Sequence, residues 1–297
     1  MQPIFMTFIE IGRKMPSIKI AHEAPLDFMP MVQQVTDYDY ALVHLFEDKD
    51  KEFAFKYYKF FENALAKGRE VILDNSLFEL EESFDIHRFF DWVYKLKPTW
   101  YIIPDYLEDK DKTLQRVQEW FELVREQESM GKKLVSKSIA VCQGKSSTEI
   151  YDCYEFLCPL VDKIAISFDY SFYLHNKGEL LTEEEAYCMG RQNLIKNLLR
   201  RFDNNPNITP KPIHLLGCAC PQEFKFYVKT QYNLIQSADT SNPVVHGLNG
   251  VRYKDYGLRT KIRTKLIEYK RVDPNYVGAE TIANIFYNIG KFKSFIQ

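Results

Sequence analysis

The sequence predicts an α/β fold in which eight strands and their helices form one (β/α)8 barrel of the TIM type. Eight short apolar segments alternate with longer amphipathic segments, and strands that alternate with helices are typical of a parallel sheet. The length of 297 residues suits a single barrel, which typically needs about 250 residues. No linker or internal repeat divides the sequence. We therefore expect one domain over residues 1–297, with a catalytic loop at 239–250 and a basic C-terminal extension at about 251–297.

The expected strands are apolar and rich in β-branched or aromatic residues, as strands buried on both faces of a sheet should be. In chain order they are Ser17–Ala21, Ala41–Leu45, Val71–Asp74, Trp100–Asp105, Ser138–Gln143, Lys163–Phe168, Ile213–Gly217 and Leu234–Asp239. The expected helices show apolar residues at helical spacing. They are Lys51–Lys67, Phe84–Leu96, Lys110–Met130, Ser147–Leu157, Thr182–Phe202, Pro221–Thr230 and Ala279–Phe292, with a short first connection at about Leu26–Gln34.

Composition and charge limit the class of protein. The net charge of −2 excludes a chain that is basic overall, so any nucleic-acid surface is expected to be a local patch. The six cysteines fall mostly in apolar segments rather than in a disulfide framework. The sequence shows no signal peptide and no apolar run of about 18 residues. We therefore expect a reduced, cytoplasmic protein with no membrane partner.

The segment Asp239–Gly250 places a carboxylate where an apolar strand meets a turn. Pro243 follows the aspartate, and Gly247 and Gly250 allow a tight backbone behind it. In strand–helix barrels the chemistry lies at the carboxyl ends of the strands, because the loops there can vary while the barrel stays fixed. An aspartate before a proline is more often a simple turn residue, so this segment alone leaves both interpretations open.

Other expected strands also end in residues that can carry chemistry. Asp74 ends the third strand and is followed by Phe78, a pair that can supply a base and a stacking face. Asp105 ends the fourth strand. Each of these can also be a turn or core residue. A functional site is therefore indicated only by their joint occurrence at successive strand ends. Comparable positions at later strand ends are held by Gln143, Gly144, Ser167, Leu216 and Gly217.

The spacing of the segment Asp239–Gly250 resembles the nucleophile segment of the tRNA-guanine transglycosylases. Proline stands four residues after the aspartate, glycine eight, asparagine ten and glycine eleven. The segments at the other strand ends resemble further motifs of that family in the family's order, over residues 74–250, more than half of the chain. The resemblance implies that Asp239 attacks the ribose of a target guanosine and displaces the base. It also implies that Asp74 acts as a general acid and base.

The resemblance further implies a base-binding pocket. Phe78 and Leu216 occupy the places of the two residues that cover the opposite faces of the base in the family. A carboxylate such as Asp105 can accept hydrogen bonds from guanine N1–H and the exocyclic amine. An amide such as Gln143 has the donor geometry for the O6/N7 edge of the purine. Further base contacts are expected from Gly144, Ser167 and Gly217.

The sequence departs from the tRNA enzymes at their structural zinc site. Tetrahedral zinc needs four ligands, and the family places them after the nucleophile. Here no cysteine follows Cys220 and no histidine follows His246. We therefore expect no metal and no cofactor, and we interpret Cys218 and Cys220 as core sulfur.

Other departures lie in the family motifs themselves. Two glycines after the family's acid–base aspartate are replaced by Ser76 and Leu77, and two frequent arginines of the nucleophile loop are replaced by Val245 and Leu248. A short, zinc-free chain of this kind is similar to the phage 7-deazaguanine DNA-modification transglycosylases, which exchange guanine in DNA. If the chain is phage-encoded, we expect it in the host cytoplasm.

A basic tract follows the nucleophile segment. Eight Lys or Arg residues lie between Arg252 and Arg271, interleaved with tyrosines. Such residues can neutralise phosphates while the rings stack on unpaired bases, although a charge run is often only a solvated helix face. The residues expected to contact nucleic acid are His246, Asn249, Arg252, Lys254, Arg259, Lys261 and Arg263.

The resemblance implies a pentosyltransferase that exchanges guanine in DNA for a 7-deazaguanine base such as 7-cyano-7-deazaguanine. Asp239 would form a covalent aspartyl–glycosyl intermediate. Three alternatives stay open: the same exchange on tRNA, of the queuosine or archaeosine type; an inactive barrel that binds nucleic acid; and an unrelated hydrolase with Asp74 and Asp239 as its acid pair. The sequence also leaves a homodimer open.

Overall fold

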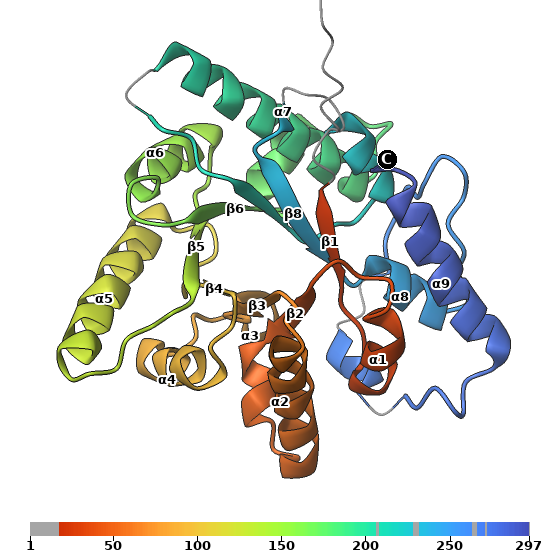
Figure 1. Ribbon diagram of the computed structural model, residues 1–297. Coiled ribbons are helices and arrows are strands. Elements are labelled where there is room, and N and C mark those ends of the chain that lie inside the picture. The colour runs from red at the N-terminus through yellow and green to blue at the C-terminus, as the bar shows by residue number, and fades with distance from the viewer. Residues whose placement is uncertain (1–17, 206–207, 228–231, 263–265, 271, 297) are drawn as a thin grey trace, which may run out of the picture.

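The computed structural model describes residues 18–205, 208–227, 232–262, 266–270 and 272–296. Eight parallel strands form a nearly closed barrel in the order β1-β8-β7-β6-β5-β4-β3-β2, with helices around it (Figure 1). The predicted (β/α)8 fold is confirmed. The strands are β1 (Lys19–His22), β2 (Asp39–Leu42), β3 (Val71–Asp74), β4 (Trp100–Ile102), β5 (Lys137–Cys142), β6 (Lys163–Ser167), β7 (Ile213–Leu216) and β8 (Ile235–Thr240).

Side-chain caps define where the main helices begin. Asp50, Asp85, Asp109 and Ser146 each accept a hydrogen bond from the backbone N–H three residues later, which satisfies a donor that the helix leaves unpaired. Thr182 forms a capping box. The α-helices are α1 (Met29–Val32), α2 (Lys51–Ala66), α3 (Leu77–Leu80), α4 (Ile86–Leu96), α5 (Lys110–Ser129), α6 (Ser147–Leu157), α7 (Glu183–Asn204), α8 (Asn242–Leu248) and α9 (Ala279–Lys293). Shorter 3-10 helices cover Leu26–Phe28, Val43–Glu47, Ser171–Asn176, Pro221–Phe226 and Leu266–Tyr269.

Two strands end three residues earlier than expected. The second strand was expected to reach Leu45, but β2 ends at Leu42, whose N–H donates to the Tyr57 hydroxyl at 3.0 Å instead of continuing the sheet. The fourth strand was expected to reach Asp105, but β4 ends at Ile102. Proline at 104 has no N–H to donate to a ladder, so the sheet cannot continue through it.

Two segments near the C-terminal half also differ from expectation. Residues 239–250 were expected as a loop, but Asp239 and Thr240 end β8 and Asn242–Leu248 form the helix α8, with Pro243 in its first turn. The segment expected as a helix from Pro221 to Thr230 is a 3-10 helix that ends at Phe226. Residues 228–231 lie outside the described part of the chain, as does Ser17, where the first strand was expected to begin. The last helix begins at Ala279 as predicted and ends at Lys293.

The seam between β1 and β2, which stand at the two ends of the strand order, is closed by side chains. Thr36 accepts a hydrogen bond from the His22 N–H at 2.8 Å and donates to the Ile20 carbonyl at 2.9 Å. Asp37 accepts from the Ile20 N–H at 2.8 Å. The loop before β2 therefore satisfies backbone groups of β1 that need hydrogen-bond partners when buried.

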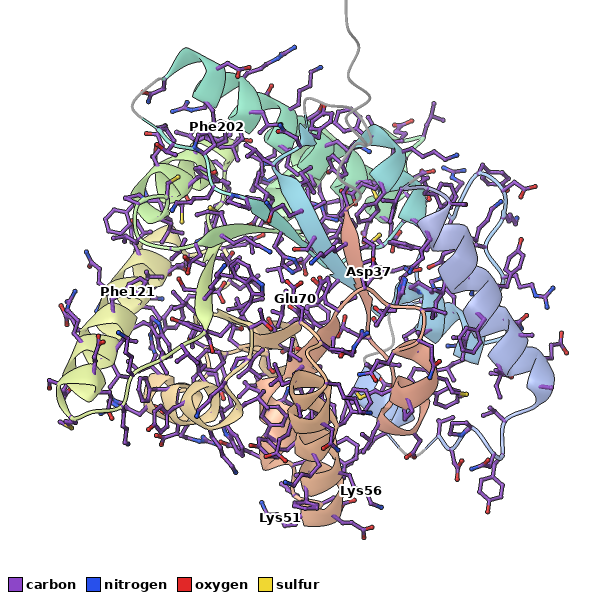
Figure 2. The ribbon with its side chains drawn as sticks, viewed as in Figure 1. Asp37, Lys51, Lys56, Glu70, Phe121 and Phe202 are labelled. Atoms are coloured by element: carbon purple, nitrogen blue, oxygen red, sulfur yellow. The ribbon has the colours of Figure 1, made fainter. Side chains whose placement is uncertain are left out.

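Apolar side chains fill most of the interior between the strands and the helices (Figure 2). This is the usual content of a barrel core. Some buried residues are polar instead, and they include Lys163 on β6, His214 on β7 and Ser237 on β8. Burying such groups costs free energy unless they are hydrogen-bonded, so their arrangement needs a specific explanation.

Candidate functional site

The structure places the predicted site residues at one end of the barrel. All eight strands run parallel, so their carboxyl ends open on the same side. Asp74 and Leu216 are the last residues of β3 and β7, and Asp239 is the last but one of β8. Ser167 ends β6, and Gln143 follows β5 directly. Side chains from five strands therefore meet the same rim.

Asp239 is held from β7. The backbone N–H of Gly217 donates to its carboxylate, with the nitrogen 3.2 Å from each oxygen. The Nε2 atom of His214 lies 3.1 Å from Oδ1 of the same carboxylate. Gly217 has a φ of +66°, a left-handed conformation that glycine adopts without steric cost. Although Asp239 is only 6% exposed, its carboxylate is thus well supplied with hydrogen bonds.

His214 was not predicted as a site residue. Burial lowers its pKa, with the charge of Asp239 acting in the opposite direction, so the imidazole is neutral at neutral pH. Its ring stacks on Tyr40, with centroids 6.1 Å apart. The Tyr40 hydroxyl in turn donates to Asp74 at 3.0 Å. The two predicted catalytic acids are therefore linked through a stacked pair of rings. The only sequence signal for His214 is a polar residue within an otherwise apolar strand.

Asp74 lies in an acidic environment. Burial raises the pKa of Asp74 well above its usual value, and the charges of Glu79 and Asp239 raise it further. Glu23 was not predicted either; burial and the charges of Asp239, Glu79 and Asp74 raise its pKa in the same way. The Glu23 N–H donates to the Thr240 carbonyl at 3.0 Å, which fixes it beside β8. Asp74 and Glu23 thus both favour the protonated form.

The loop after Asp74 keeps the backbone shape of a glycine turn. Ser76 has a φ of 64°, in the left-handed region that favours glycine, and its N–H donates to Asp74 at 2.8 Å. Its neighbour Asn75 donates to Asp105 at 2.8 Å and so joins the β3 and β4 loops. Phe78 on α3 is 58% exposed, so its ring lies at the surface rather than in the core.

Asp105 and Gln143 form a buried pair. The Gln143 amide donates to Asp105 at 2.6 Å and accepts from the Glu108 N–H at 2.9 Å. Burial raises the pKa of Asp105 to about 6, although the hydrogen bonds from Gln143 and Asn75 lower it. A heterocycle that engaged these two side chains would take over hydrogen bonds that they now make to each other.

Gly144 and Ser167 have local structural roles. A Cβ atom on Gly144 would lie 2.6 Å from the Cβ of Glu149, so α6 can approach this loop only because the residue is glycine. The hydroxyl of Ser167 donates to Asp169 at 2.8 Å. Their predicted contacts with the base stay predictions.

A buried ion pair supports the end of β7. Arg191 on α7 and Glu223 are both completely buried, and the guanidinium donates to both carboxylate oxygens at 2.8 Å. Arg191 also donates to the carbonyls of Leu216 and Gly217, at 2.8 Å and 2.9 Å. The same residue therefore holds the turn whose N–H reaches Asp239. Sequence reasoning missed this pair, because its members lie 32 residues apart on different elements.

Two of the residues predicted to contact nucleic acid make hydrogen bonds within the protein. His246 is buried on α8 and its Nδ1 lies 2.8 Å from the Asn242 carbonyl, so its position does not support a direct phosphate contact. Asn249 donates to the Val245 carbonyl at 2.8 Å and to the hydroxyl of Tyr269. The side chains of both residues therefore contribute to the local fold.

The basic tract is partly neutralised within the chain. Arg259 forms an ion pair with Glu185 at 3.0 Å. Arg252 donates to Asn284, while the ammonium groups of Lys254 and Lys261 lie 5.9 Å and 5.6 Å from the rings of Tyr256 and Phe168. Arg263 lies outside the described residues.

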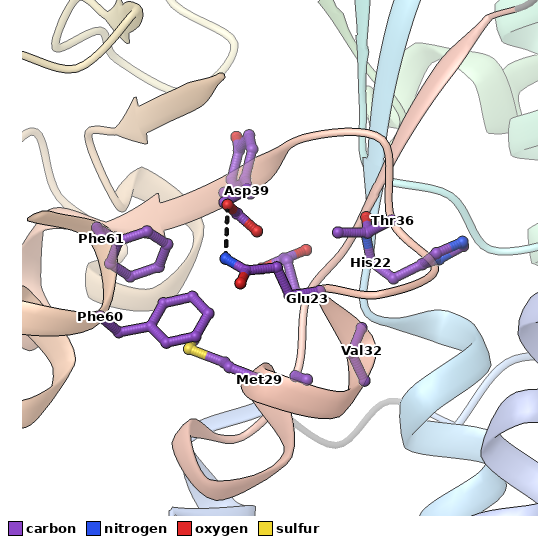
Figure 3. Close-up of a pocket in the computed structure, with 11 residues that line it drawn as sticks. His22, Glu23, Met29, Val32, Thr36, Asp39, Phe60 and Phe61 are labelled. Atoms are coloured by element: carbon purple, nitrogen blue, oxygen red, sulfur yellow. Dashed lines mark hydrogen bonds between the residues drawn. The ribbon is translucent and has the colours of Figure 1, made fainter. Parts of the chain in front are cut away.

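Two cavities are lined in part by Glu23 and Glu79, two of the acidic residues near Asp74. One has an empty volume of about 260 Å³ and opens at the seam of β1 and β2, where Glu23, Asp39 and Phe61 line it (Figure 3). The other has an empty volume of about 380 Å³, and its lining includes Glu79 and the segment Leu266–Ile267. The seam cavity reaches Tyr40 and Glu23, which both interact with the predicted catalytic acids.

The described part of the chain contains neither a cluster suited to a metal ion nor a helix suited to cross a membrane. No group of three or more His, Cys, Asp or Glu side chains there is arranged to hold a metal ion. Within the same residues, no helix combines the length and apolar character needed to cross a membrane.

No family model and no curated protein matches this sequence.

Proposed function

We propose that the protein is a guanine transglycosylase that exchanges guanine in DNA for a 7-deazaguanine base. The observation that carries this proposal is that Asp239 and Asp74 lie at the same rim of the barrel, where burial and the charges of Glu79 and Asp239 raise the pKa of Asp74. The Asp239 carboxylate is held by a backbone N–H and a neutral imidazole, while the raised pKa of Asp74 favours its protonated form. A nucleophile and a proton donor at one rim suit displacement of a base from a sugar.

The first half of the reaction forms the covalent intermediate. A carboxylate oxygen of Asp239 attacks C1′ of the target nucleotide, and the bond from C1′ to N9 breaks with its electron pair moving to guanine. Asp74 gives its proton to the departing base. The target nucleotide must leave the base stack first, because C1′ cannot be reached inside a duplex.

The second half regenerates the enzyme. The incoming 7-deazaguanine gives its N9 proton to Asp74, N9 attacks C1′, and the ester bond to Asp239 breaks. Asp74 is therefore protonated again and Asp239 is again a carboxylate. Asp105 and Gln143 would hold the heterocycle in both halves, between Phe78 and Leu216. DNA is favoured over tRNA by the missing zinc ligands and by the apolar residues Val245 and Leu248 on α8, where the tRNA enzymes often have arginine.

A labelled-base assay tests the function directly. The protein is incubated with radiolabelled guanine and with either DNA or tRNA, and each polymer is scored for incorporated label. Uptake into DNA alone supports the proposal, and uptake into tRNA alone assigns the same chemistry to the other polymer. If neither polymer takes up label or forms a covalent adduct, the proposal is wrong and an inactive barrel is the better reading.

Asp74→Asn is expected to separate the two halves of the reaction. An amide cannot supply the proton that guanine needs or accept the proton of the incoming base, so guanine should leave slowly and exchange should stop. Denaturing gels should then show a protein–polynucleotide adduct that persists, while no labelled base enters the polymer. Complete exchange at the normal rate in this variant would remove Asp74 from the mechanism.

The affinity for the free base is expected to depend on the ionisation of Asp105. Its pKa is raised to about 6, so the carboxylate is ionised at neutral pH and becomes protonated below pH 6. A protonated carboxyl is a poorer acceptor for guanine N1–H and the exocyclic amine, so affinity should fall by up to about tenfold per pH unit below 6. Calorimetric titration of 7-deazaguanine between pH 5 and pH 8 measures this. Asp105→Asn should bind 7-deazaguanine weakly at every pH. If the affinity of this variant still falls below pH 6 as in the unmutated protein, Asp105 does not bind the base.

A further inference from the structure

A chain of buried polar groups runs through the barrel away from Asp239. His214 Nδ1 lies 2.9 Å from the Ser237 hydroxyl, and the ammonium of Lys163 lies 3.4 Å from the same hydroxyl. Ser237 and Asp239 are two residues apart on β8 and thus face the same side of the strand. Lys163 is the first residue of β6, so this row of polar groups begins near the amino-terminal end of the barrel.

The chemistry of the groups gives this chain a direction. An ammonium can only donate, so Lys163 donates to the Ser237 oxygen. The Ser237 hydroxyl hydrogen is then free to donate to Nδ1 of His214, which leaves the proton of the neutral imidazole on Nε2, facing the carboxylate of Asp239. The opposite tautomer would turn the Nε2 lone pair toward that carboxylate, an arrangement that is repulsive unless Asp239 is protonated.

We propose that Lys163 is a remote positioning residue that fixes the tautomer of His214 and thereby keeps Asp239 as a hydrogen-bonded carboxylate. This inference rests on the proposed function of Asp239 as the nucleophile, although the tautomer itself does not depend on any reaction. Lys163 touches neither the base nor the sugar in this scheme. It acts through Ser237 and His214.

The surroundings of Lys163 make its charge sensitive to pH. It is 3% exposed and lies 4.1 Å from the centroid of the Trp100 ring. Burial lowers the pKa of Lys163 to about 8; the charge of Glu70 opposes this shift, and Lys19 and Lys137 add to it. Lys163 is therefore charged below pH 8 and neutral above it. Adduct formation should decline as the pH rises through about 8, because a neutral amine can accept the Ser237 proton instead of donating.

Nitrogen NMR of the histidine side chains tests the tautomer without any substrate. The protein has six histidines, and the spectrum of His214→Gln identifies the signals of His214. At pH 7 the unmutated protein should show protonated Nε2 and unprotonated Nδ1. Lys163→Met should shift His214 toward the other tautomer, and Ser237→Ala should do the same by removing the next link. Lys137→Met is the matched control, because this exposed lysine lies 5.2 Å from the same Trp100 ring.

Stability and adduct formation separate a positioning role from a purely structural one. A buried cation with a lowered pKa destabilises the fold while it is charged, so Lys163→Met should raise the melting temperature at pH 7. The same variant should slow adduct formation by about tenfold, a size typical of losing a residue that orients another functional group. Its rate should also lose the decline above pH 8.

Each outcome decides the inference. An unchanged His214 tautomer in Lys163→Met overturns it, as does a variant that forms adduct at the normal rate. If Lys163→Met lowers the melting temperature and the rate of adduct formation keeps its pH dependence, Lys163 has a structural role only. If the unmutated protein forms no adduct with either polymer but the tautomer shifts as expected, the proposed function fails while the assignment of the polar chain stands.

Discussion

Asp239→Asn is expected to abolish the covalent adduct with the polynucleotide. An amide oxygen is a far weaker nucleophile than a carboxylate, and removing a covalent nucleophile commonly costs about 10⁴-fold or more in rate. The fold should survive, because the change is nearly isosteric and an amide oxygen can still accept from the Gly217 N–H and from His214. Denaturing gels of protein mixed with DNA or tRNA, together with thermal melts, measure both effects.

Asp111→Asn is the matched control for this change. Asp111 lies in the first turn of α5, and its side chain is 90% exposed, so the same chemical substitution there should leave the adduct and the melting temperature unchanged. A band that persists in Asp239→Asn would assign the nucleophile elsewhere, with Asp74 as the next choice.

Arg191→Met is expected to produce the largest loss of stability. It would leave the Glu223 carboxylate completely buried without its ion-pair partner. Breaking a buried pair from one side typically costs about 3–5 kcal/mol, which corresponds to roughly 10 °C in melting temperature for a chain of this size. The carbonyls of Leu216 and Gly217 would lose their donors as well, so the Gly217 N–H should hold Asp239 less firmly.

Two further variants check the physical reason for that loss. Arg191→Met combined with Glu223→Leu removes both charges, so it should recover part of the stability. Arg259→Met breaks the exposed pair with Glu185 and should leave the melting temperature nearly unchanged. If the double variant melts no higher than Arg191→Met alone, the unpaired carboxylate is not the cause of the loss.

The sequence by itself determined the barrel and the rim on which the predicted residues lie. Alternating apolar and amphipathic segments are local signals, and so are caps such as Ser146 and Thr182. Parallel strands then bring their carboxyl ends together regardless of detail. For this reason the sequence is sufficient to assign Asp74, Leu216 and Asp239 to one edge of the barrel. The local pattern predicted a longer fourth strand, but β4 ends before Pro104. The missing N–H of this proline prevents the sheet from continuing.

The tertiary structure alone decided what surrounds those residues. His214 meets Asp239 across two strands, Arg191 meets Glu223 from another helix, and Lys163 reaches Ser237 over 74 residues of sequence. In the sequence none of these residues carries a signal that identifies its partner. The tilt and register of neighbouring strands and the packing of α7 bring the partners together. Hydrogen bonds and buried charges act only over a few ångströms, so the environment of Asp239 is set by that three-dimensional arrangement.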